Sequence, residues 1–511
     1  MFDVTRSESL SLTHTVAFEG LEARRVEVQC AVTAGLPSFA IVGLPDKAVS
    51  EARERVRTAL QAMAIALPSK RITVNLSPAD LPKEGSHFDL PIAVALLAAL
   101  DMIPKDEVEQ TVALGELSLN GDLVGVVGAL PAAMAAAESS RRLLCPKASG
   151  AEAAWVGSTE VVAARSLGEV LRHFNGQAPL TPADPGEVTL PPCARDMAEV
   201  KGQERAKRAI EIAAAGRHHV LLVGAPGSGK SMLAARIPGI LPPLEASEAL
   251  ETSMIHSLSG LLDEGGISRT RPFREPHHTA SMAAIVGGGR GAKPGEISLA
   301  HNGVLFMDEF PEFPRAVLET LRQPIETGSV MVARANHHVR YPSRFMLIAA
   351  ANPCRCGQSG EPGFVCKRGP KCAEDYMGKI SAPLMDRFDL RVEVPPVSFA
   401  DLDMPATGEP SAAIATRVSE ARTRQRERYK AIDGAEVNAD IEGALLENAA
   451  ALCEEGKELL RRAAEKFGFS ARGYHRVMRV ARTIADLEGS ESVGRTHVAE
   501  AISYRLTMGP Q

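Results

Sequence analysis

The chain has 511 residues, of which 45% are hydrophobic and 23% charged, and its formal net charge is −6. These values exclude a disordered or collagen-like chain and predict two or three folded domains. The negative net charge gives no reason to expect nucleic-acid binding by the chain as a whole. Any contact with DNA must therefore come from a local group of basic residues. The first twenty residues do not form a signal peptide. No run reaches the roughly twenty apolar residues of a membrane span, so we expect a cytoplasmic protein without membrane contact.

Two segments resemble linkers, because they are rich in proline and acidic residues and lack periodic apolar positions: residues 175–192 and 396–412. We therefore predict an N-terminal domain over residues 1–174, a central domain over 193–395 and a C-terminal domain over 413–511.

The central domain alternates strand-like and helical runs, which predicts an α/β fold with a parallel sheet. Its expected strands cover residues 218–223, 304–308, 345–351 and 388–394. The C-terminal domain has helical spacing throughout and is predicted to be an all-α lid. The N-terminal domain mixes strands such as RITVNL with alanine-rich helices, so it is α+β or α/β.

A phosphate-binding loop is predicted where the sequence reads GAPGSGKS, directly after the strand-like run HHVLLV. In this pattern backbone N–H groups surround phosphate oxygens, Lys230 reaches the β- and γ-phosphates, and Ser231 binds magnesium. The expected cofactors are ATP and Mg²⁺. The residues expected at the nucleotide are Gly224, Ala225, Pro226, Gly227, Ser228, Gly229, Lys230, Ser231 and Met232.

An acidic strand end follows about seventy residues later, in the run VLFMDE. Asp308 is expected to hold magnesium, and Glu309 to orient or deprotonate the attacking water. Asn352 ends the next strand and is expected beside the γ-phosphate. Two further candidates are Arg387, in LMDRFD, and Arg472, in SARGYHRV. Arg387 resembles an arginine finger, which enters the active site of a neighbouring subunit, and Arg472 resembles the sensor arginine of a lid. The alternative is that both are ordinary surface arginines on helices, which is the common case.

Several motifs together resemble the ComM/YifB family of magnesium-chelatase-like AAA+ ATPases. They are GAPGSGKS, RPFREPHHTAS, PGEISLAHNGVLFMDE, ANPC, LMDRFDL and ARTIADL, with LPKEGSHFDLPIA near the N-terminus. The resemblance implies a ring, commonly a hexamer, and a DNA helicase that drives branch migration when incoming single-stranded DNA recombines in natural transformation. The alternative is a chelatase-like ATPase that remodels a protein partner for metal insertion into a tetrapyrrole.

Two segments are candidates for DNA contact. Residues 252–302 form a long insertion that contains Lys293 and Arg290 in GGGRGAKPG. Residues 324–342 are predicted to form a hairpin. Its cationic or titratable side chains are Arg334, His337, His338 and Arg340. The family resemblance places both segments toward a ring's pore, where they would follow a phosphate backbone. Solvated loops are the alternative.

Two other groups of polar residues have a structural interpretation. His277 and His278 are expected to point in different directions, which favours packing or a subunit interface over a metal. The basic run over residues 417–430 is more typical of a solvated helix face than of a DNA contact.

The N-terminal domain resembles the Lon-type protease fold. The expected serine position in PKEGSHFD holds His87, with Ser86 displaced by one residue, and Leu130 or Pro131 stands where the lysine would fall. A serine nucleophile needs a base within reach, so we expect no peptidase activity.

A cysteine cluster lies over residues 354–372. Its members are Cys354, Cys356, Cys366 and Cys372. Four thiolates on a short segment are able to hold structural zinc, and free thiols are the alternative. A catalytic cysteine is not expected, because the sequence offers no base nearby.

Overall fold

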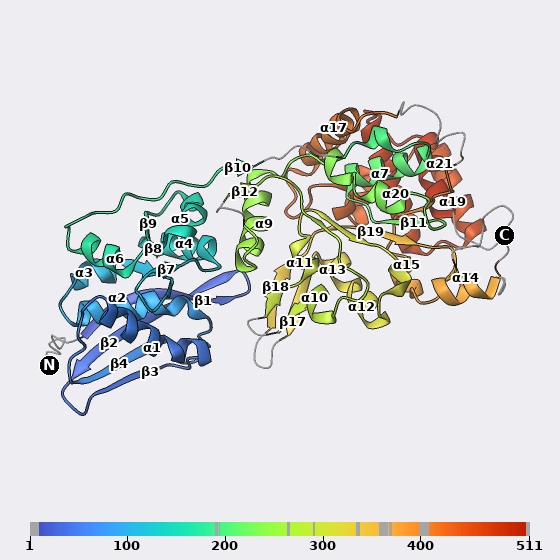
Figure 1. Cartoon of the computed structure of the whole chain (residues 1–511). Helices are drawn as coiled ribbons and strands as arrows, with labels where there is room; N and C mark the ends of the chain where they lie inside the picture. Colours follow the sequence, from blue (N-terminus) through green and yellow to red (C-terminus); the bar gives the residue numbers. More distant parts are fainter. Residues whose placement is uncertain are drawn as a thin grey trace.

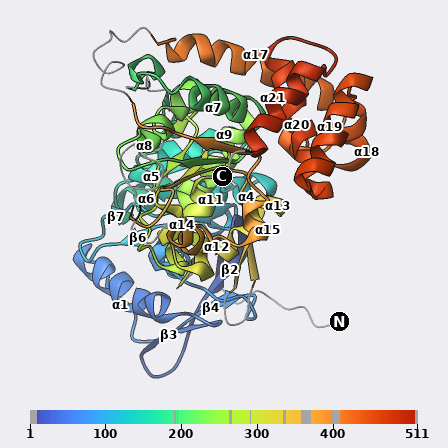
Figure 2. The ribbon, with the colours of Figure 1, turned by 90° about the vertical axis from the view of Figure 1, so that its right-hand side faces the viewer.

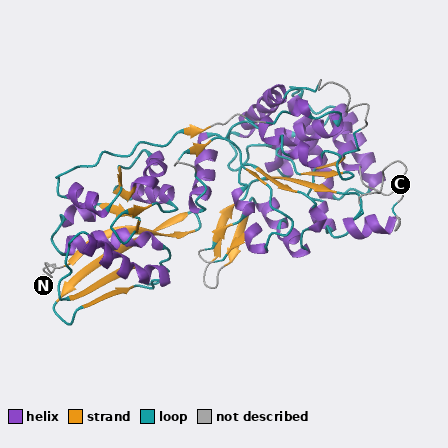
Figure 3. Ribbon diagram, in the orientation of Figure 1, coloured by secondary structure: helices purple, strands orange, loops and turns teal. Residues whose placement is uncertain are grey.

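Two α/β units and a group of helices follow one another along the chain (Figure 1). The computed structural model describes residues 10–189, 193, 195–262, 266–289, 292–333, 338–356, 366, 370–397 and 408–506. Helices and strands alternate through both units, whereas the part described after residue 408 is built from helices (Figure 3).

The N-terminal unit is built on a seven-stranded sheet with the order β3-β4-β2-β1-β5-β8-β9. β1 and β2 form a long antiparallel hairpin, and β5, β8 and β9 add to it in parallel. All eleven residues of α2 are buried, because this helix packs against β1, β2 and α1. The expected strand RITVNL is β4. The elements are β1 (Leu10–Glu19), β2 (Glu22–Thr33), β3 (Ser38–Val42), α1 (Lys47–Ala62), β4 (Arg71–Ser77), α2 (Asp89–Ala99), α3 (Lys105–Glu109), β5 (Thr111–Ala113), β6 (Glu116–Leu117), β7 (Leu123–Val124), α4 (Ala129–Glu138), β8 (Arg142–Pro146), α5 (Lys147–Ala153), β9 (Val161–Ala164), α6 (Leu167–Phe174) and β10 (Val188–Thr189).

The central unit contains a five-stranded parallel sheet with the order β13-β16-β19-β11-β20. Every residue of β11, β16 and β19 is buried, as expected for a sheet covered on both faces. The predicted parallel α/β sheet is confirmed. Its elements are α7 (Glu204–Gly216), β11 (Val220–Val223), α8 (Lys230–Ala234), α9 (Ala246–Leu258), β12 (Ile267–Ser268), β13 (Phe273–Arg274), α10 (Met282–Val286), β14 (Gly287–Gly288), β15 (Lys293–Pro294), α11 (Glu296–Leu299), β16 (Val304–Met307), α12 (Arg315–Thr320), α13 (Arg322–Thr327), β17 (Ser329–Ala333), β18 (His338–Pro342), β19 (Met346–Ala351), α14 (Pro370–Met377), α15 (Ala382–Met385) and β20 (Leu390–Glu393).

Two expected segments differ from the structure. Residues 252–302 do not form a single insertion, because they begin inside α9 and supply β13, the edge strand of the sheet. β13 has only two residues, too few to show a periodic pattern. The predicted hairpin over residues 324–342 starts later than expected. Its first residues belong to α13, and the antiparallel pairing of β17 with β18 runs from Ser329 to Pro342.

The C-terminal helices gather on one side of the molecule, with α17 next to α7 (Figure 2). α17 (Ser411–Tyr429), α18 (Gly443–Ala449), α19 (Glu454–Phe467), α20 (Ala471–Leu487) and α21 (Arg495–Leu506) make up this lid. α17 and α20 pack on α7, and α21 packs near β20, so lid and sheet share one apolar core. The predicted helical C-terminal region is confirmed.

Helix α9 connects the N-terminal unit to the central unit (Figure 1). The buried carboxylate of Glu152, in α5, accepts hydrogen bonds from the Leu130 N–H at 3.0 Å and from the Ser257 hydroxyl of α9. Trp155 packs against Leu244 and Ala249. β10, within the predicted linker, pairs in parallel with β12. The two units are therefore joined by side-chain and backbone contacts as well as by the chain.

Candidate nucleotide-binding site

The predicted phosphate loop connects the carboxyl end of β11 to the start of α8. Gly227 and Gly229 have φ of +78° and +92°, a left-handed conformation that glycine adopts without strain. A Cβ at Gly224 would lie 2.2 Å from the Val394 carbonyl oxygen, so this position requires glycine for a close approach. The loop therefore has the backbone geometry that the sequence pattern demands.

The Lys230 ammonium lies inside this loop. Its Nζ donates hydrogen bonds to the carbonyls of Gly224 and Ala225, both at 2.8 Å, and to Asn352 Oδ1 at 3.2 Å. Burial lowers the pKa of Lys230, while the carboxylates of Asp308 and Glu309 oppose that shift. The loop lysine and the residue at the end of β19 thus meet at one edge of the sheet, as the strand order predicts.

The two expected magnesium ligands also lie together. Ser231 Oγ donates to Asp308 Oδ2 at 2.6 Å, and the Glu309 N–H donates to Asp308 Oδ1 at 2.8 Å. Hydroxyl and carboxylate oxygens are the ligands that Mg²⁺ prefers, so this pair fits a magnesium–nucleotide complex. Glu309 has a φ of +49°, unusual for a residue with a side chain, and its backbone turns at this point.

His278 also lies at this candidate site, although the sequence predicts packing or a subunit interface for it. Its Nδ1 lies 3.3 Å from Glu309 Oε2. The expectation that the two histidines point apart is wrong, because the rings of His277 and His278 lie with centroids 4.2 Å apart. β13 brings both to the carboxyl edge of the sheet, where β16 ends. The signal was the position of EPHH directly after a strand, but that strand was not recognised.

The two candidate arginines lie at the opposite edge of the sheet. Arg472, in α20, approaches Glu326 Oε1 with its NH1 at 3.2 Å, and the Arg387 guanidinium pairs with the same carboxylate. Arg387 precedes β20, close to Asp389, whose carboxylate accepts from the N–H of the residue before β11. One four-residue strand, about 13 Å at ~3.3 Å per residue, separates this edge from the phosphate loop.

A polar cavity of about 720 Å³ opens beside these arginines. Glu326, Arg472, Asp389 and Arg476 are among its lining residues. The Arg472 side chain is 68% exposed, whereas Arg387 is 6% exposed and covered by Glu326. Neither arginine lies beside the Lys230 of its own chain.

The two candidate DNA segments are neighbours. β14 and β15 form a small antiparallel hairpin, and the Tyr341 hydroxyl of β18 donates to the Ala292 carbonyl at 2.9 Å. The side chains of Lys293 and Arg340 are exposed. The other basic candidates, Arg290, Arg334 and His337, lie outside the described residues, and His338 is placed only as the first residue of β18.

The basic run in α17 forms intramolecular contacts. Arg422 is buried and donates to the Ala214 carbonyl, Arg417 pairs with Glu211, and Arg428 pairs with Asp486. These contacts join α17 to α7 and to α20. The expected solvated helix face is therefore wrong for these arginines, because Arg422 is buried and the others bind groups of neighbouring helices.

The residues of the N-terminal unit that were compared with a protease active site do not form a serine–lysine pair. Ser86 donates to Glu116, and the buried His87 ring nitrogen lies 2.9 Å from the Val16 carbonyl oxygen. Leu130 and Pro131 are buried in α4. Lys83 is buried and donates to the Pro78 carbonyl.

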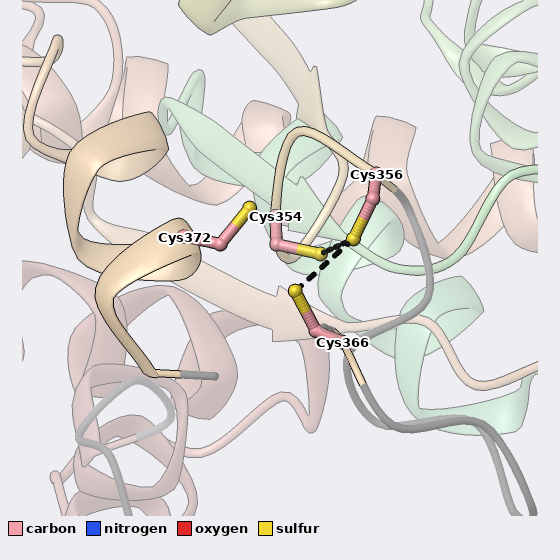
Figure 4. A group of neighbouring side chains, drawn as sticks. All are labelled: Cys354, Cys356, Cys366 and Cys372. Carbon is pink, nitrogen blue, oxygen red and sulfur yellow. Dashed lines mark hydrogen bonds between the residues drawn. The ribbon is translucent and has the colours of Figure 1, made fainter. Parts of the chain in front are cut away.

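The four clustered cysteines come together (Figure 4). Their sulfur atoms all lie within 4.8 Å of one another. The Cys354 and Cys356 sulfurs are 3.0 Å apart, and those of Cys356 and Cys366 are 3.3 Å apart.

The parallel sheet, the phosphate loop after β11 and the helical lid define a P-loop protein of the AAA+ type. Family models agree with this class along the chain. Residues 196–402 match "Magnesium chelatase, subunit ChlI", residues 26–149 match "Subunit ChlI of Mg-chelatase", and residues 408–505 match "Magnesium chelatase, subunit ChlI C-terminal".

Relatives define the family more narrowly. The chain is 42% identical over 508 residues to "Competence protein ComM" of Haemophilus influenzae, and 41% identical over 500 residues to "Uncharacterized protein YifB" of Escherichia coli, covering 97% of both chains in each case. A "Magnesium-chelatase 38 kDa subunit" of Rhodobacter capsulatus is 27% identical over 377 residues, which is 65% of this chain and 93% of that protein. The chain belongs to the ComM/YifB family of magnesium-chelatase-like proteins. This family indicates ATPase activity with ATP and Mg²⁺. Among the described helices, none is long and apolar enough to cross a membrane.

Proposed function

We propose that the chain is a cytoplasmic ATP-hydrolysing motor that assembles into a ring, a hexamer, and moves branched DNA. Its role would be branch migration during recombination of incoming single-stranded DNA. One observation carries the proposal. The chain combines a nucleotide site with two adjacent hairpins that expose Lys293 and Arg340. The similarity to a protein named for competence supports the biological setting.

ATP hydrolysis would use the residues at the carboxyl edge of the sheet. Lys230 would leave the loop carbonyls to bind the β- and γ-phosphates, and Ser231 and Asp308 would hold magnesium, whose charge would offset that of the transferring phosphoryl group. Glu309 orients the attacking water and accepts its proton. His278 holds the Glu309 carboxylate in place from the neighbouring strand end.

Arg387 and Arg472 would act on a neighbouring subunit. Both lie at the edge of the sheet opposite Lys230, so they are remote from the phosphates of their own chain. In a ring, this edge of one subunit would face the phosphate loop of the next, and release from Glu326 would free both guanidiniums. Hydrolysis would then require an assembled ring, so turnover would depend on neighbouring chains.

The exposed hairpins would contact DNA. Cationic side chains on adjacent hairpins follow a phosphate backbone without reading its sequence, as a motor that moves along DNA requires. The β17–β18 hairpin also packs on the N-terminal unit, where a Cβ at Gly20 would lie 2.5 Å from Val339. This contact would transmit hairpin motion to the N-terminal unit.

The N-terminal unit would serve assembly, with a Lon-protease-like fold and no peptidase chemistry. His87 is buried against a backbone carbonyl, and Ser86 hydrogen-bonds to Glu116. We expect no casein hydrolysis by the full chain. Hydrolysis that disappears in Ser86→Ala would contradict this.

The similarity to magnesium-chelatase subunits supports a second candidate, an ATPase that remodels a protein partner. ATPase turnover with and without single-stranded or forked DNA separates the two functions. We expect DNA to stimulate turnover, and Lys230→Ala and Glu309→Gln to abolish the stimulated and the basal rates. Active ATPase without any DNA stimulation would favour the protein-remodelling function.

A further inference from the structure

The cysteine cluster differs from the other buried cysteines of the chain. Cys30 and Cys145 lie among aliphatic core residues, and burial raises the pKa of both thiols to about 12. The clustered cysteines instead pack on one another. Among the described residues, their buried cluster consists of Cys354, Cys366 and Cys372, with Ala373 beside it. A core made of thiols alone gains little from apolar packing, which points to a ligand.

The sulfur geometry fits a tetrahedral ion. Zinc–sulfur bonds of about 2.3 Å place tetrahedral sulfurs about 3.8 Å apart. The observed contacts of 3.0 Å and 3.3 Å and the upper limit of 4.8 Å lie on both sides of that value. The sulfurs of Cys354 and Cys356, in the turn after β19, and of Cys366 lie in contact with one another, and Cys372 of α14 lies beside them (Figure 4). Cys356 is exposed and gives an ion access from solvent.

The cluster is directly connected to the nucleotide site. Cys354 lies two residues after Asn352, whose Oδ1 accepts from Lys230 at 3.2 Å. One helical turn beyond Cys372, the ring of the buried Tyr376 lies 5.3 Å from the ammonium of Lys379, which pairs with Glu312 at 3.3 Å. The turn after β19 therefore connects the cysteines to the phosphate loop, and α14 connects them to the segment after β16.

We propose that Cys354, Cys356, Cys366 and Cys372 bind one structural zinc ion, and that this ion positions Asn352 against Lys230. The ion joins the turn after β19 to α14, two segments that contribute little apolar packing at this point. Metal binding then supplies the stability that packing does not. Asn352 contacts the phosphate loop through Lys230. The cysteines are positioning residues that act through Asn352.

Zinc content tests whether the four cysteines bind a zinc ion. This measurement requires neither ATP nor DNA, so it is independent of the proposed motor function. Protein purified without chelators should contain about one zinc per chain, measured by mass spectrometry of the metal. Cys356→Ser and Cys372→Ser should lose it, while Cys193→Ser, an exposed cysteine outside the cluster, should keep it. Cobalt substitution should give thiolate-to-metal absorption. If the serine variants do not fold, release of zinc from the wild type by a thiol-blocking mercurial decides the question. Wild-type protein with less than about a tenth of an equivalent would overturn the proposal.

Kinetics test whether the ion positions Asn352 against Lys230, which is the part of the proposal that rests on the proposed ATPase activity. Cys356→Ser should lower kcat about 10-fold, with ATP-analogue affinity unchanged within about 3-fold. Asn352→Ala should likewise lower kcat and leave ATP-analogue affinity unchanged. Combining Asn352→Ala with Cys356→Ser should lower kcat no further than either change alone. Zinc-free protein with wild-type kcat, or additive losses in the double variant, would overturn the link to Asn352.

Discussion

His278 lies beside Glu309, with Nδ1 3.3 Å from Oε2, although the two residues belong to different strand ends. The contact exists because β13 and β16 pair in parallel and both end at the same edge of the sheet. The carboxylate expected to orient water therefore has a neighbour that is able to fix its direction.

Removing this neighbour should slow the chemical step. We expect His278→Ala to lower kcat about 10-fold with little change in KM, because Glu309 loses its orientation while ATP binding is retained. Glu309→Gln should lower kcat about 100-fold or more. His277→Ala is the matched control, since His277 bonds to Thr279 at 2.8 Å and not to Glu309. Steady-state ATPase assays measure all three, and full activity in His278→Ala would exclude the positioning role.

The placement of Arg387 and Arg472 predicts complementation between chains. Lys230→Ala and Arg387→Ala should each be inactive alone. When equal amounts are mixed and allowed to exchange subunits, about one quarter of the interfaces will join an intact Lys230 to an intact Arg387. Activity should therefore return to a similar fraction. The same holds for Arg472→Ala.

Arg461→Ala is the control for these variants, because Arg461 is an exposed lid arginine that pairs with Glu458. It should keep wild-type turnover. No recovery in any mixture would mean that the arginines serve the site of their own chain.

Asp389 should hold the lid to the sheet. Its buried carboxylate accepts from Arg476 at 2.6 Å and from the His219 N–H at 3.0 Å. Asp389→Ala leaves Arg476 without its buried partner, a change that typically costs about 3–5 kcal/mol. Urea unfolding followed by circular dichroism should show this loss, and equal midpoints would contradict it.

The same carboxylate predicts the pH dependence of stability. Burial alone would raise the pKa of Asp389, but Arg476 and His218 outweigh burial and hold it well below its usual value. A lowered folded-state pKa stabilises the protein above the unfolded value of about 3.9 and loses that effect as the pH falls through the folded value. The difference between wild type and Asp389→Ala should thus be constant near neutral pH and shrink only below about pH 4.

The hairpins predict salt-dependent DNA binding. Lys293→Ala and Arg340→Ala should weaken single-stranded DNA binding and reduce the slope of log affinity against log salt by about 0.7 for each phosphate that the variant no longer neutralises. Basal ATPase should stay within about 2-fold, since neither side chain contacts the nucleotide site. Lys430→Ala, an exposed lysine after α17, is the charge-matched control. If it weakens binding equally, the hairpins are not the DNA site.

The grouping of residues at the candidate nucleotide site was predictable because its motifs are local. Lys230, Ser231, Asp308 and Glu309 occur in two short runs, and the rule that parallel strands end at one edge brings these runs together. The relation of Arg387 and Arg472 to Glu326 was not predictable, since it depends on where the lid packs. The arginines of α17 show the same limit. Their charge pattern is visible in the sequence, whereas the carbonyls and carboxylates that bind them come from other helices.

Movement of a DNA junction tests the central claim most directly. A three-stranded DNA substrate with labelled strands reports branch migration in real time, with Glu309→Gln as a variant that binds ATP without turnover. We predict that the wild-type chain moves the junction only with hydrolysable ATP and Mg²⁺, and that Glu309→Gln leaves it in place. A wild-type preparation that hydrolyses ATP in the presence of this DNA but never moves the junction would contradict the account.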